Sequence, residues 1–165
     1  MRKTIHEVFD DISNEKDLAK RAVILTKNDT GPLRQLLKLN FDQYQNFDLP
    51  EGAPPFKSDP KIPIGMADTN LFVEVRRLYI FMKEKDLPRI KKEALFIQML
   101  EGLHHTEAEL LIAVKDGKLE ERYKGVTREL VDTVFPFLLD KPAVPVEPTK
   151  RGKGRPRKNV VSSPT

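Results

Sequence analysis

Apolar side chains recur with helical spacing through the first part of the chain. In three successive stretches they stand three or four positions apart, which places them on one face of a helix. These positions are Ile5, Val8, Phe9 and Ile12, then Leu18, Ala22 and Leu25, and then Leu33, Leu36, Leu37 and Phe41. Ser13 and Asn14 can end the first helix and cap the second, and Thr30 can cap the third. The pattern predicts three short amphipathic helices that pack as a small bundle.

The stretch from residue 43 to residue 67 has no helical period and contains five prolines. An irregular segment of this length within a compact domain is unusual and is often functional. Its apolar side chains argue against a free linker; they are Phe47, Leu49, Phe56, Ile62, Ile64 and Met66. We predict that the segment lies over the helices and covers their core. The alternative is that it forms a surface for a partner protein.

Helical spacing returns after this segment. Four further sets of apolar positions follow, namely Leu71, Phe72, Val75, Leu78, Tyr79 and Met82; Ile90, Ala94, Ile97 and Leu100; Leu110, Leu111 and Val114; and Leu130, Val131 and Val134. Asp86–Pro88 marks the start of the second set, and the last set ends near Pro136. Each set predicts one amphipathic helix.

Capping residues support the last two of these helices. Thr106, with Glu109 three positions later, has the signature of a capping box, in which each side chain satisfies a backbone N–H of the other residue. Gly117 fits the position just after the C-terminus of the same helix. The pair Asp116–Gly117 could instead turn a β-hairpin, but the capping signature and the helical spacing favour the helix. Thr127 is predicted to cap the last helix.

Charge divides the chain into two parts. The net charge is +4, from 29 Lys/Arg and 25 Asp/Glu residues. Residues 141–165 hold seven of these cations and one of these acids, a net +6, which leaves residues 1–140 with 22 cations and 24 acids, a net −2. We therefore predict a mostly α fold, a compact bundle of six to seven short helices over residues 1–140 with the proline-rich residues 43–67 embedded in it. Residues 141–165 are predicted to be a disordered basic tail.

Nine residues of this tail carry six of its cations. They are Lys150, Arg151, Gly152, Lys153, Gly154, Arg155, Pro156, Arg157 and Lys158. Nothing apolar is present to bury, so the segment suits an extended path along a polyanion. Pro156 favours an extended conformation at Arg155, the residue before it. An extended Gly-Arg-Pro between cations fits the narrow minor groove of A·T-rich duplex DNA, where the negative potential favours an inserted arginine.

Residues 150–158 resemble an AT-hook, the short minor-groove element of chromatin-type proteins. Gly154, Arg155 and Pro156 match three residues of its Arg-Gly-Arg-Pro core, and the cations on either side match its basic flanks. Lys153 departs from the family, which prefers arginine there; lysine keeps the charge but loses the planar fork. The resemblance implies that all nine residues bind DNA, with Arg155 in the minor groove. The alternatives are a solubilising tail or a localisation signal, because short Lys/Arg-rich runs serve both.

Three segments of the body resemble a family of small uncharacterised proteins in large tailed phages of the T4 type. The segments are Leu49–Phe56, Glu109–Leu119 and Tyr123–Thr127. The resemblance extends over residues 1–140. It implies a phage origin and a mostly helical body, and it supplies no activity and no catalytic residues.

The body offers little support for catalysis or for metal binding. Glu101 and His104 have the spacing of a helical metal-ligand pair, with His105 beside them, but di-metal bundles need this motif twice, so a surface near a helix end is favoured. No serine stands in a nucleophile elbow, no glycine-rich phosphate loop is present, and the chain has no cysteine. Arg76–Arg77 and Lys91–Glu93 are predicted to be exposed helix faces, although they could contact phosphates. We expect no enzyme activity, no cofactor and no metal.

These features predict a non-enzymatic phage protein that binds double-stranded DNA through its tail and recruits a protein partner or a second copy through its body. One alternative is an adaptor for replication, transcription or virion machinery, whose tail only concentrates it on DNA. Another is an enzyme of nucleic-acid metabolism that the tail anchors. The N-terminus lacks the apolar region of a secretory signal, and no run is long enough to span a bilayer. We expect no membrane association, and a place at the nucleoid in the cytoplasm of the infected bacterium or in the virion.

Overall fold

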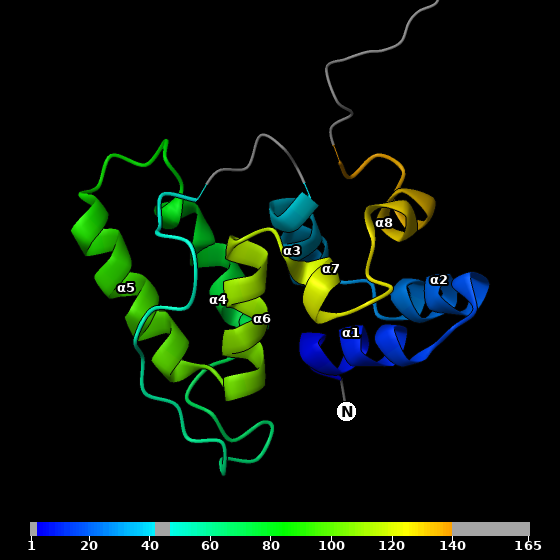
Figure 1. Cartoon of the computed structure of the whole chain (residues 1–165), viewed down its shortest axis with the longest axis horizontal. Helices are drawn as coiled ribbons and strands as arrows, with labels where there is room; N and C mark the ends of the chain where they lie inside the picture. Colours follow the sequence, from blue (N-terminus) through cyan, green and yellow to red (C-terminus); the bar gives the residue numbers. More distant parts are fainter. Residues whose placement is uncertain (1–2, 42–46, 140–165) are drawn as a thin grey trace, which may run out of the picture.

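The computed structural model describes residues 3–41 and 47–139, and in these ranges the backbone is mostly helical. The helices are α1 (Ile5–Asn14), α2 (Leu18–Lys27), α3 (Gly31–Phe41), α4 (Leu71–Glu74), the 3-10 helix η1 (Val75–Phe81), α5 (Arg89–Gly102), α6 (His105–Lys115), α7 (Leu119–Arg122) and α8 (Arg128–Val134) (Figure 1). No strand forms in the described ranges, where one isolated antiparallel bridge joins Phe47 to Met82. The predicted mostly α fold is confirmed. The predicted disordered tail, residues 141–165, lies outside the described residues.

The described residues hold more helices than the six to seven that the sequence predicts. The apolar run that begins at Leu71 is one helix in the prediction, whereas the structure divides it into α4 and η1. The four-residue helix α7 is absent from the prediction, because a single turn is too short to show a helical period.

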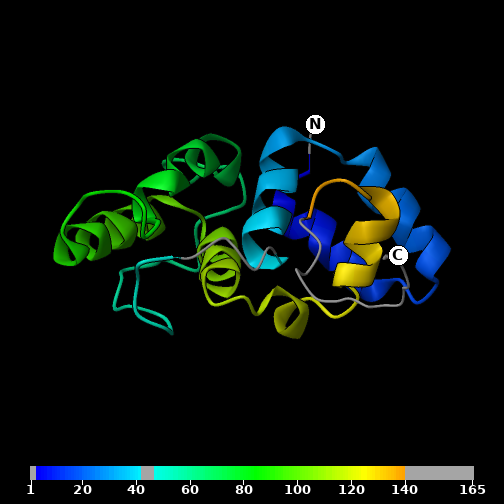
Figure 2. The ribbon, with the colours of Figure 1, turned by 90° about the horizontal axis from the view of Figure 1, so that it is seen from above.

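Helix α6 lies at the centre of the fold. It packs against α1, α3, α5 and α7, so it joins the N-terminal helices to the second half of the chain. Helices α5 and η1 form one end of the molecule, and α2 with α8 forms the other (Figure 2). None of the helices in the described ranges is long and apolar enough to cross a membrane.

The first and third helices form as their sequences predict. The predicted apolar positions are buried in α1 (Ile5, Val8, Phe9 and Ile12) and, apart from the half-buried Phe41, in α3 (Leu33, Leu36 and Leu37). Thr4 caps α1 by accepting the backbone N–H of Glu7 at 3.2 Å, and the Glu7 carboxylate accepts the backbone N–H of Thr4 at 2.9 Å. The hydroxyl of Thr30 accepts the backbone N–H of Leu33 at 3.3 Å, as the sequence predicts for this cap.

The prediction for α2 is wrong in two details. Asp17 caps the helix by accepting the backbone N–H of Ala19 at 2.9 Å, whereas Asn14 is the last residue of α1. Of the three predicted face residues only Leu25 is buried, and Leu18 is exposed. Helix α2 lies at one end of the molecule against α1 and α8, so most of its surface faces solvent.

The predicted buried face of α5 is correct at Leu100, which is buried, and wrong at its start. The prediction starts from Ile90, yet its side chain is 82% exposed and Ala94 is exposed as well. The buried residues are Lys92, Phe96, Met99 and Leu100. Lys92, Phe96 and Met99 each stand two residues after the first three predicted positions, Ile90, Ala94 and Ile97, and two residues turn an α-helix through about 200°. Lys92 therefore occupies the place in the core that the pattern assigns to an apolar residue.

For α6 the predicted N-terminal cap is wrong and the predicted C-terminal glycine is correct. His104, not Thr106, caps the N-terminus, because its Nδ1 accepts the backbone N–H of Thr106 at 3.3 Å. Gly117 follows the C-terminus with φ of +70°, and the backbone N–H of Lys118 reaches the carbonyl of Ala113 at 2.8 Å. These bonds continue the helix into a Schellman turn, so the hairpin alternative is wrong. Thr127 caps α8 through the backbone N–H of Leu130 at 3.1 Å, as predicted.

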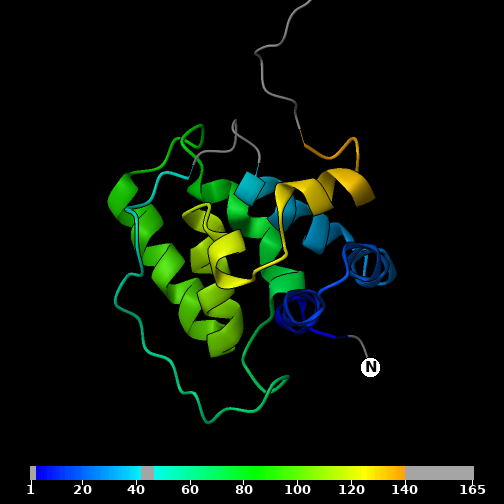
Figure 3. The ribbon, with the colours of Figure 1, turned by 45° about the vertical axis from the view of Figure 1, so that its right-hand side comes forward.

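The described part of the proline-rich segment, residues 47–67, covers the core over only half of its length. Phe47, Leu49 and Phe56 pack partly buried against the core, which confirms the prediction for this half. The second half turns away below the helices, and Ile64 and Met66 are exposed there, the latter by 72% (Figure 3). The predicted cover is therefore wrong for the second half.

Candidate functional site

The nine residues predicted to bind DNA, 150–158, lie outside the described residues. The description ends at Leu139, after α8. The contacts of the body therefore neither support nor oppose the AT-hook interpretation, which stays a prediction. What the body does show is how its own polar groups are used.

Two buried lysines tie the first half of the proline-rich segment to the helices. Lys115 donates to the carbonyl of Pro50 at 2.8 Å and pairs with Asp116, whose carboxylate accepts the backbone N–H of Gly52 at 3.1 Å. The segment arches over α5 and α6 and encloses a cavity of about 330 Å³. Apolar side chains such as Phe96 form much of its wall, and the ammonium of Lys115, which also lines it, donates to the Pro50 carbonyl.

Lys92 is the second of these lysines, and its side chain is 1% exposed. Its ammonium donates to the carboxylate of Asp48 at 2.9 Å and to the carbonyl of Met82 at 2.7 Å. The hydrogen bond from Lys92 lowers the pKa of Asp48, since it stabilises the ionised carboxylate. The prediction of an exposed face is wrong for this residue. One signal could have found it, because Lys92 stands four and seven positions before Phe96 and Met99, in helical register with them.

Glu101 and His104 hold the second half of the segment. The carboxylate of Glu101 accepts the backbone N–H of Lys57 at 2.9 Å. His104 is buried rather than at a surface, and its Nε2 lies 2.8 Å from the carbonyl oxygen of Ile62. That oxygen can only accept, so Nε2 carries the proton and Nδ1 is the acceptor that caps α6. Both ring nitrogens are therefore engaged in protein contacts, and in the described ranges no group of three or more His, Cys, Asp or Glu converges on a metal site.

Two acidic side chains are buried near the junction of α4 with α6. Glu74 accepts from the hydroxyl of Thr69 at 2.7 Å and from the guanidinium of Arg77 at 3.0 Å. Glu107 is 3% exposed and accepts the backbone N–H of Leu71 at 3.4 Å. Burial raises the pKa of Glu107 to about 7, against the opposing effect of that hydrogen bond. The spacing pattern gave no sign that either acid is buried, because it assigns acidic side chains to exposed positions. For Glu74 the available signal was Arg77, three positions later in helical register.

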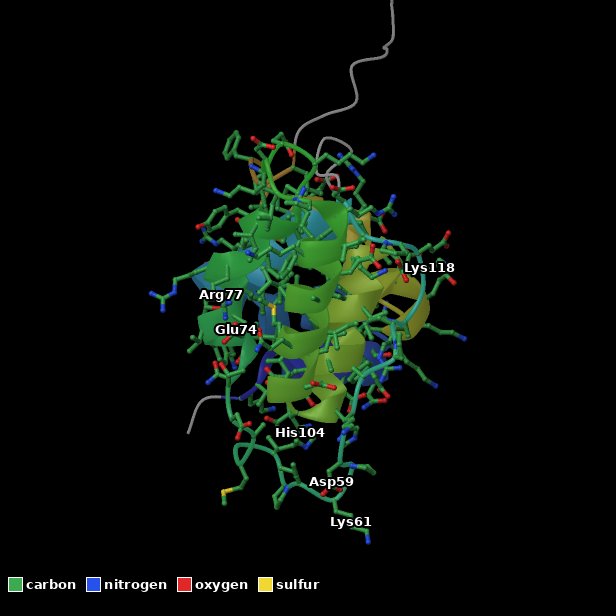
Figure 4. The ribbon with its side chains drawn as sticks, turned by 90° about the vertical axis from the view of Figure 1, so that its left-hand side faces the viewer. Asp59, Lys61, Glu74, Arg77, His104 and Lys118 are labelled. Carbon is green, nitrogen blue, oxygen red and sulfur yellow. The ribbon has the colours of Figure 1, made fainter. Side chains whose placement is uncertain are left out.

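The outer side of η1 carries the Arg76–Arg77 pair, and both side chains are exposed as the sequence predicts. Figure 4 shows Arg77 above Glu74 on the η1 side of α5, whereas Lys118 lies on the opposite side. Tyr79 is 62% exposed, and the ammonium of Lys85 lies 5.7 Å from the centre of its ring. Exposed cations and an exposed aromatic ring therefore share one side of the body.

Comparison with known proteins gives one match. Residues 8–121 match the model of a family described as a family of unknown function (DUF6433). No curated protein matches, and no solved structure does. The matched range contains Leu49–Phe56 and Glu109–Leu119, two of the three segments that carry the resemblance of the body.

Proposed function

Because the chain belongs to a family of unknown function, we propose its function from its own residues: it is a non-enzymatic protein that binds A·T-rich duplex DNA through residues 150–158. The observation that carries this proposal is the separation of charge, with a net +6 in residues 141–165 and a net −2 in residues 1–140. An acidic body is repelled by a polyanion, so a basic segment attached to it determines where the protein binds.

The residue types in the segment support the minor groove as its site. Gly152 and Gly154 leave no side chains to hold the backbone away from the groove, and Pro156 favours an extended path. Arg155 then enters the groove, and the flanking cations contact phosphates on both strands. On the resemblance of the body we place the protein in a tailed phage, acting at the nucleoid of the infected bacterium.

A second candidate function is an adaptor, and one observation favours it. The second half of the proline-rich segment exposes Ile62, Ile64 and Met66, which are apolar residues close together in the sequence. Exposed apolar groups of this kind mark contacts with other proteins more often than single exposed residues do. In this case the tail only concentrates the protein on DNA, and the partner of the body determines the function.

The test of the proposed function is the preference of the full chain for A·T-rich over G·C-rich duplex DNA. Arg155→Ala should weaken binding to the A·T-rich duplex about tenfold and have less effect on the G·C-rich one, because the narrow groove deepens the potential around an inserted arginine. Lys150→Ala is the matched control, and it should weaken both about equally, as a phosphate contact does. Lys153→Arg should tighten binding to A·T-rich DNA, since it restores the second arginine of the hook.

Titrations of both duplexes at several salt concentrations measure these effects. Six cations that neutralise about four to six phosphates should give a slope of log K against log salt of about −4 to −5. Equal losses on both duplexes for Arg155→Ala would leave a basic tail without a hook. Full binding after neutralisation of residues 150–158 would contradict the proposal and place the DNA site in the body.

A further inference from the structure

The 3-10 helix η1 presents cations and a tyrosine on one exposed side. Residues three apart in a 3-10 helix lie directly above one another, so Arg76 and Tyr79 form a row, with Arg77 beside it. All three side chains are exposed. The ammonium of Lys85 lies 5.7 Å from the centre of the Tyr79 ring, which extends this side beyond the C-terminus of η1.

Lys91 continues the same side onto the first turn of α5. Successive residues of an α-helix are about 100° apart, so Lys91 and Glu93 lie on opposite sides of the buried Lys92. Glu93 lines the cavity under the proline-rich segment. Figure 4 shows that segment along one side of α5 and η1 along the other. Lys91 lies on the side of Lys92 away from Glu93 and the segment, and Lys92 itself bonds to the carbonyl of Met82, the residue after η1. We call Arg76, Arg77, Tyr79, Lys85 and Lys91 the η1 basic patch.

This end of the molecule is positive although the body as a whole is negative. Residues 71–91 contain six cations and three acids, a net +3, so the rest of residues 1–140 carries a net −5. The three acids are Glu74, which is buried and paired with Arg77, and Glu84 and Asp86, which are exposed on the turn before α5. In the described ranges neither Arg76 nor Lys91 has an ion-pair partner within 4.0 Å, so both are available to an external anion.

We propose that the η1 basic patch binds the phosphates of the same duplex that residues 150–158 hold. This inference deepens the proposed function and rests on it. The two adjacent guanidinium groups suit phosphate, which arginine can contact with two parallel hydrogen bonds. The hydroxyl of Tyr79 can donate to a phosphate oxygen, as tyrosine does in protein–DNA contacts. Arg76 and Tyr79 stand three residues apart, about 6 Å at 2.0 Å per residue, which matches about two phosphates at 3.4 Å per strand.

Chain geometry favours DNA as the ligand over an acidic protein or a membrane. The nine residues 141–149 between body and hook span at most about 30 Å. The linker leaves the body after α8, at the other end of the molecule from η1 (Figure 2), so one duplex meets both sites by running along the body. A duplex held by the hook stays near the body at a high effective concentration. The two sites would then strengthen each other: the hook brings the duplex close, and the patch adds phosphate contacts that carry no sequence preference.

The test uses the full chain and three sets of substitutions. Arg76→Gln with Lys91→Gln neutralises two exposed cations of the patch and leaves the ion pair between Arg77 and the buried Glu74 intact. Lys16→Gln with Lys20→Gln is the matched control, because these exposed lysines lie at the other end of the molecule and remove the same charge. Arg155→Ala with Arg157→Ala and Lys158→Ala disables the tail. Each variant is titrated onto A·T-rich and G·C-rich duplexes at several salt concentrations, after its thermal unfolding has been matched to that of the parent chain.

The patch variant should bind both duplexes about tenfold more weakly than the parent, with a salt slope that is shallower by about 2, because two phosphate contacts are lost. The control should change the affinity by less than twofold.

If the patch variant behaved like the control and the tail variant lost binding, this inference would be overturned and the proposed function would stand. If the tail variant kept full affinity for DNA and the patch variant lost it, the tail-borne function would be overturned and the patch would remain as a DNA site. Unchanged DNA binding with lost binding to phosphatidylserine vesicles would also overturn the inference, by assigning the patch to a membrane surface.

Discussion

Replacing Lys92 with alanine should lower the free energy of unfolding by about 2–5 kcal/mol, the range found when a long buried side chain is shortened to alanine. The side chain of Lys92 is 1% exposed, and its methylene stem lies in the row of core residues that includes Phe96 and Met99. The substitution leaves a cavity there and also removes the donor to Asp48 and Met82. Urea unfolding of the parent and the variant, compared at a common slope, measures the loss.

Lys92→Met separates packing from charge at the same position. Methionine keeps most of the length and the apolar stem of lysine but has no ammonium. The Asp48 carboxylate that loses its partner is 26% exposed, so water can solvate it and the loss of the charge pair costs less than the loss of the stem. We therefore expect Lys92→Met to be much closer to the parent chain than Lys92→Ala. If the methionine variant lost as much stability as the alanine variant, the hydrogen bonds to Asp48 and Met82 would outweigh the packing of the stem, and the account given for α5 would be wrong.

Lys92 also shows why the fold could be predicted from the sequence and one face of it could not. Apolar periodicity identified the helical regions, because burial of an amphipathic face is the main source of helix stability in a protein. The same rule failed on α5, where it selected Ile90 over Lys92. A lysine enters the core when partners from elsewhere satisfy its ammonium, and here those partners are Asp48 and Met82, which are distant in sequence. A pattern within one helix carries no information about them.

The prediction of the N-terminal cap of α6 was wrong for a related reason. The sequence Thr106 to Glu109 has the right spacing for a capping box, but the helix begins two residues earlier and His104 takes the role. Histidine is not among the preferred capping residues. Its place here depends on the carbonyl of Ile62, which holds the ring in the tautomer that leaves Nδ1 free to accept. That contact is tertiary, so no local rule could supply it.

The candidate sites also differ in whether local sequence or tertiary structure reveals them. Residues 150–158 could be selected from the sequence because a short linear motif needs no tertiary context. The η1 basic patch could be noticed only in part, as the pair Arg76–Arg77. Its other members, Lys85 and Lys91, join the pair across a turn and from another helix, and the exposure of Tyr79 is visible only in the folded chain.

Glu107 gives the fold a dependence on pH that has a definite sign. Its pKa is about 7 in the folded protein and 4.5 in the ordinary state. Between these values the unfolded chain has released the proton while the folded protein still holds it, so rising pH favours unfolding. The stability that the protonated carboxyl contributes is fully present below pH 4.5 and is lost as the pH rises through about 7. The difference of about 2.5 in pKa corresponds to about 3 kcal/mol at 1.36 kcal/mol for each unit.

Glu107→Gln should therefore raise the free energy of unfolding by about 3 kcal/mol at pH 8.5 and leave it nearly unchanged at pH 4.5. Glutamine keeps the oxygen that accepts from Leu71 and never ionises.

Burial lowers the pKa of His6, which makes the parent chain more stable as pH rises and opposes the effect of Glu107. The readout is thus the difference between variant and parent in urea unfolding from pH 4.5 to 8.5, in which the contribution of His6 cancels. Glu109→Gln, at an exposed position of the same helix where the carboxylate pairs with Arg122, is the control and should lower the free energy of unfolding by no more than about 1 kcal/mol. If the difference in free energy of unfolding between Glu107→Gln and the parent did not change with pH, the carboxyl would have its ordinary pKa in the folded protein. Water or a cation would then reach it.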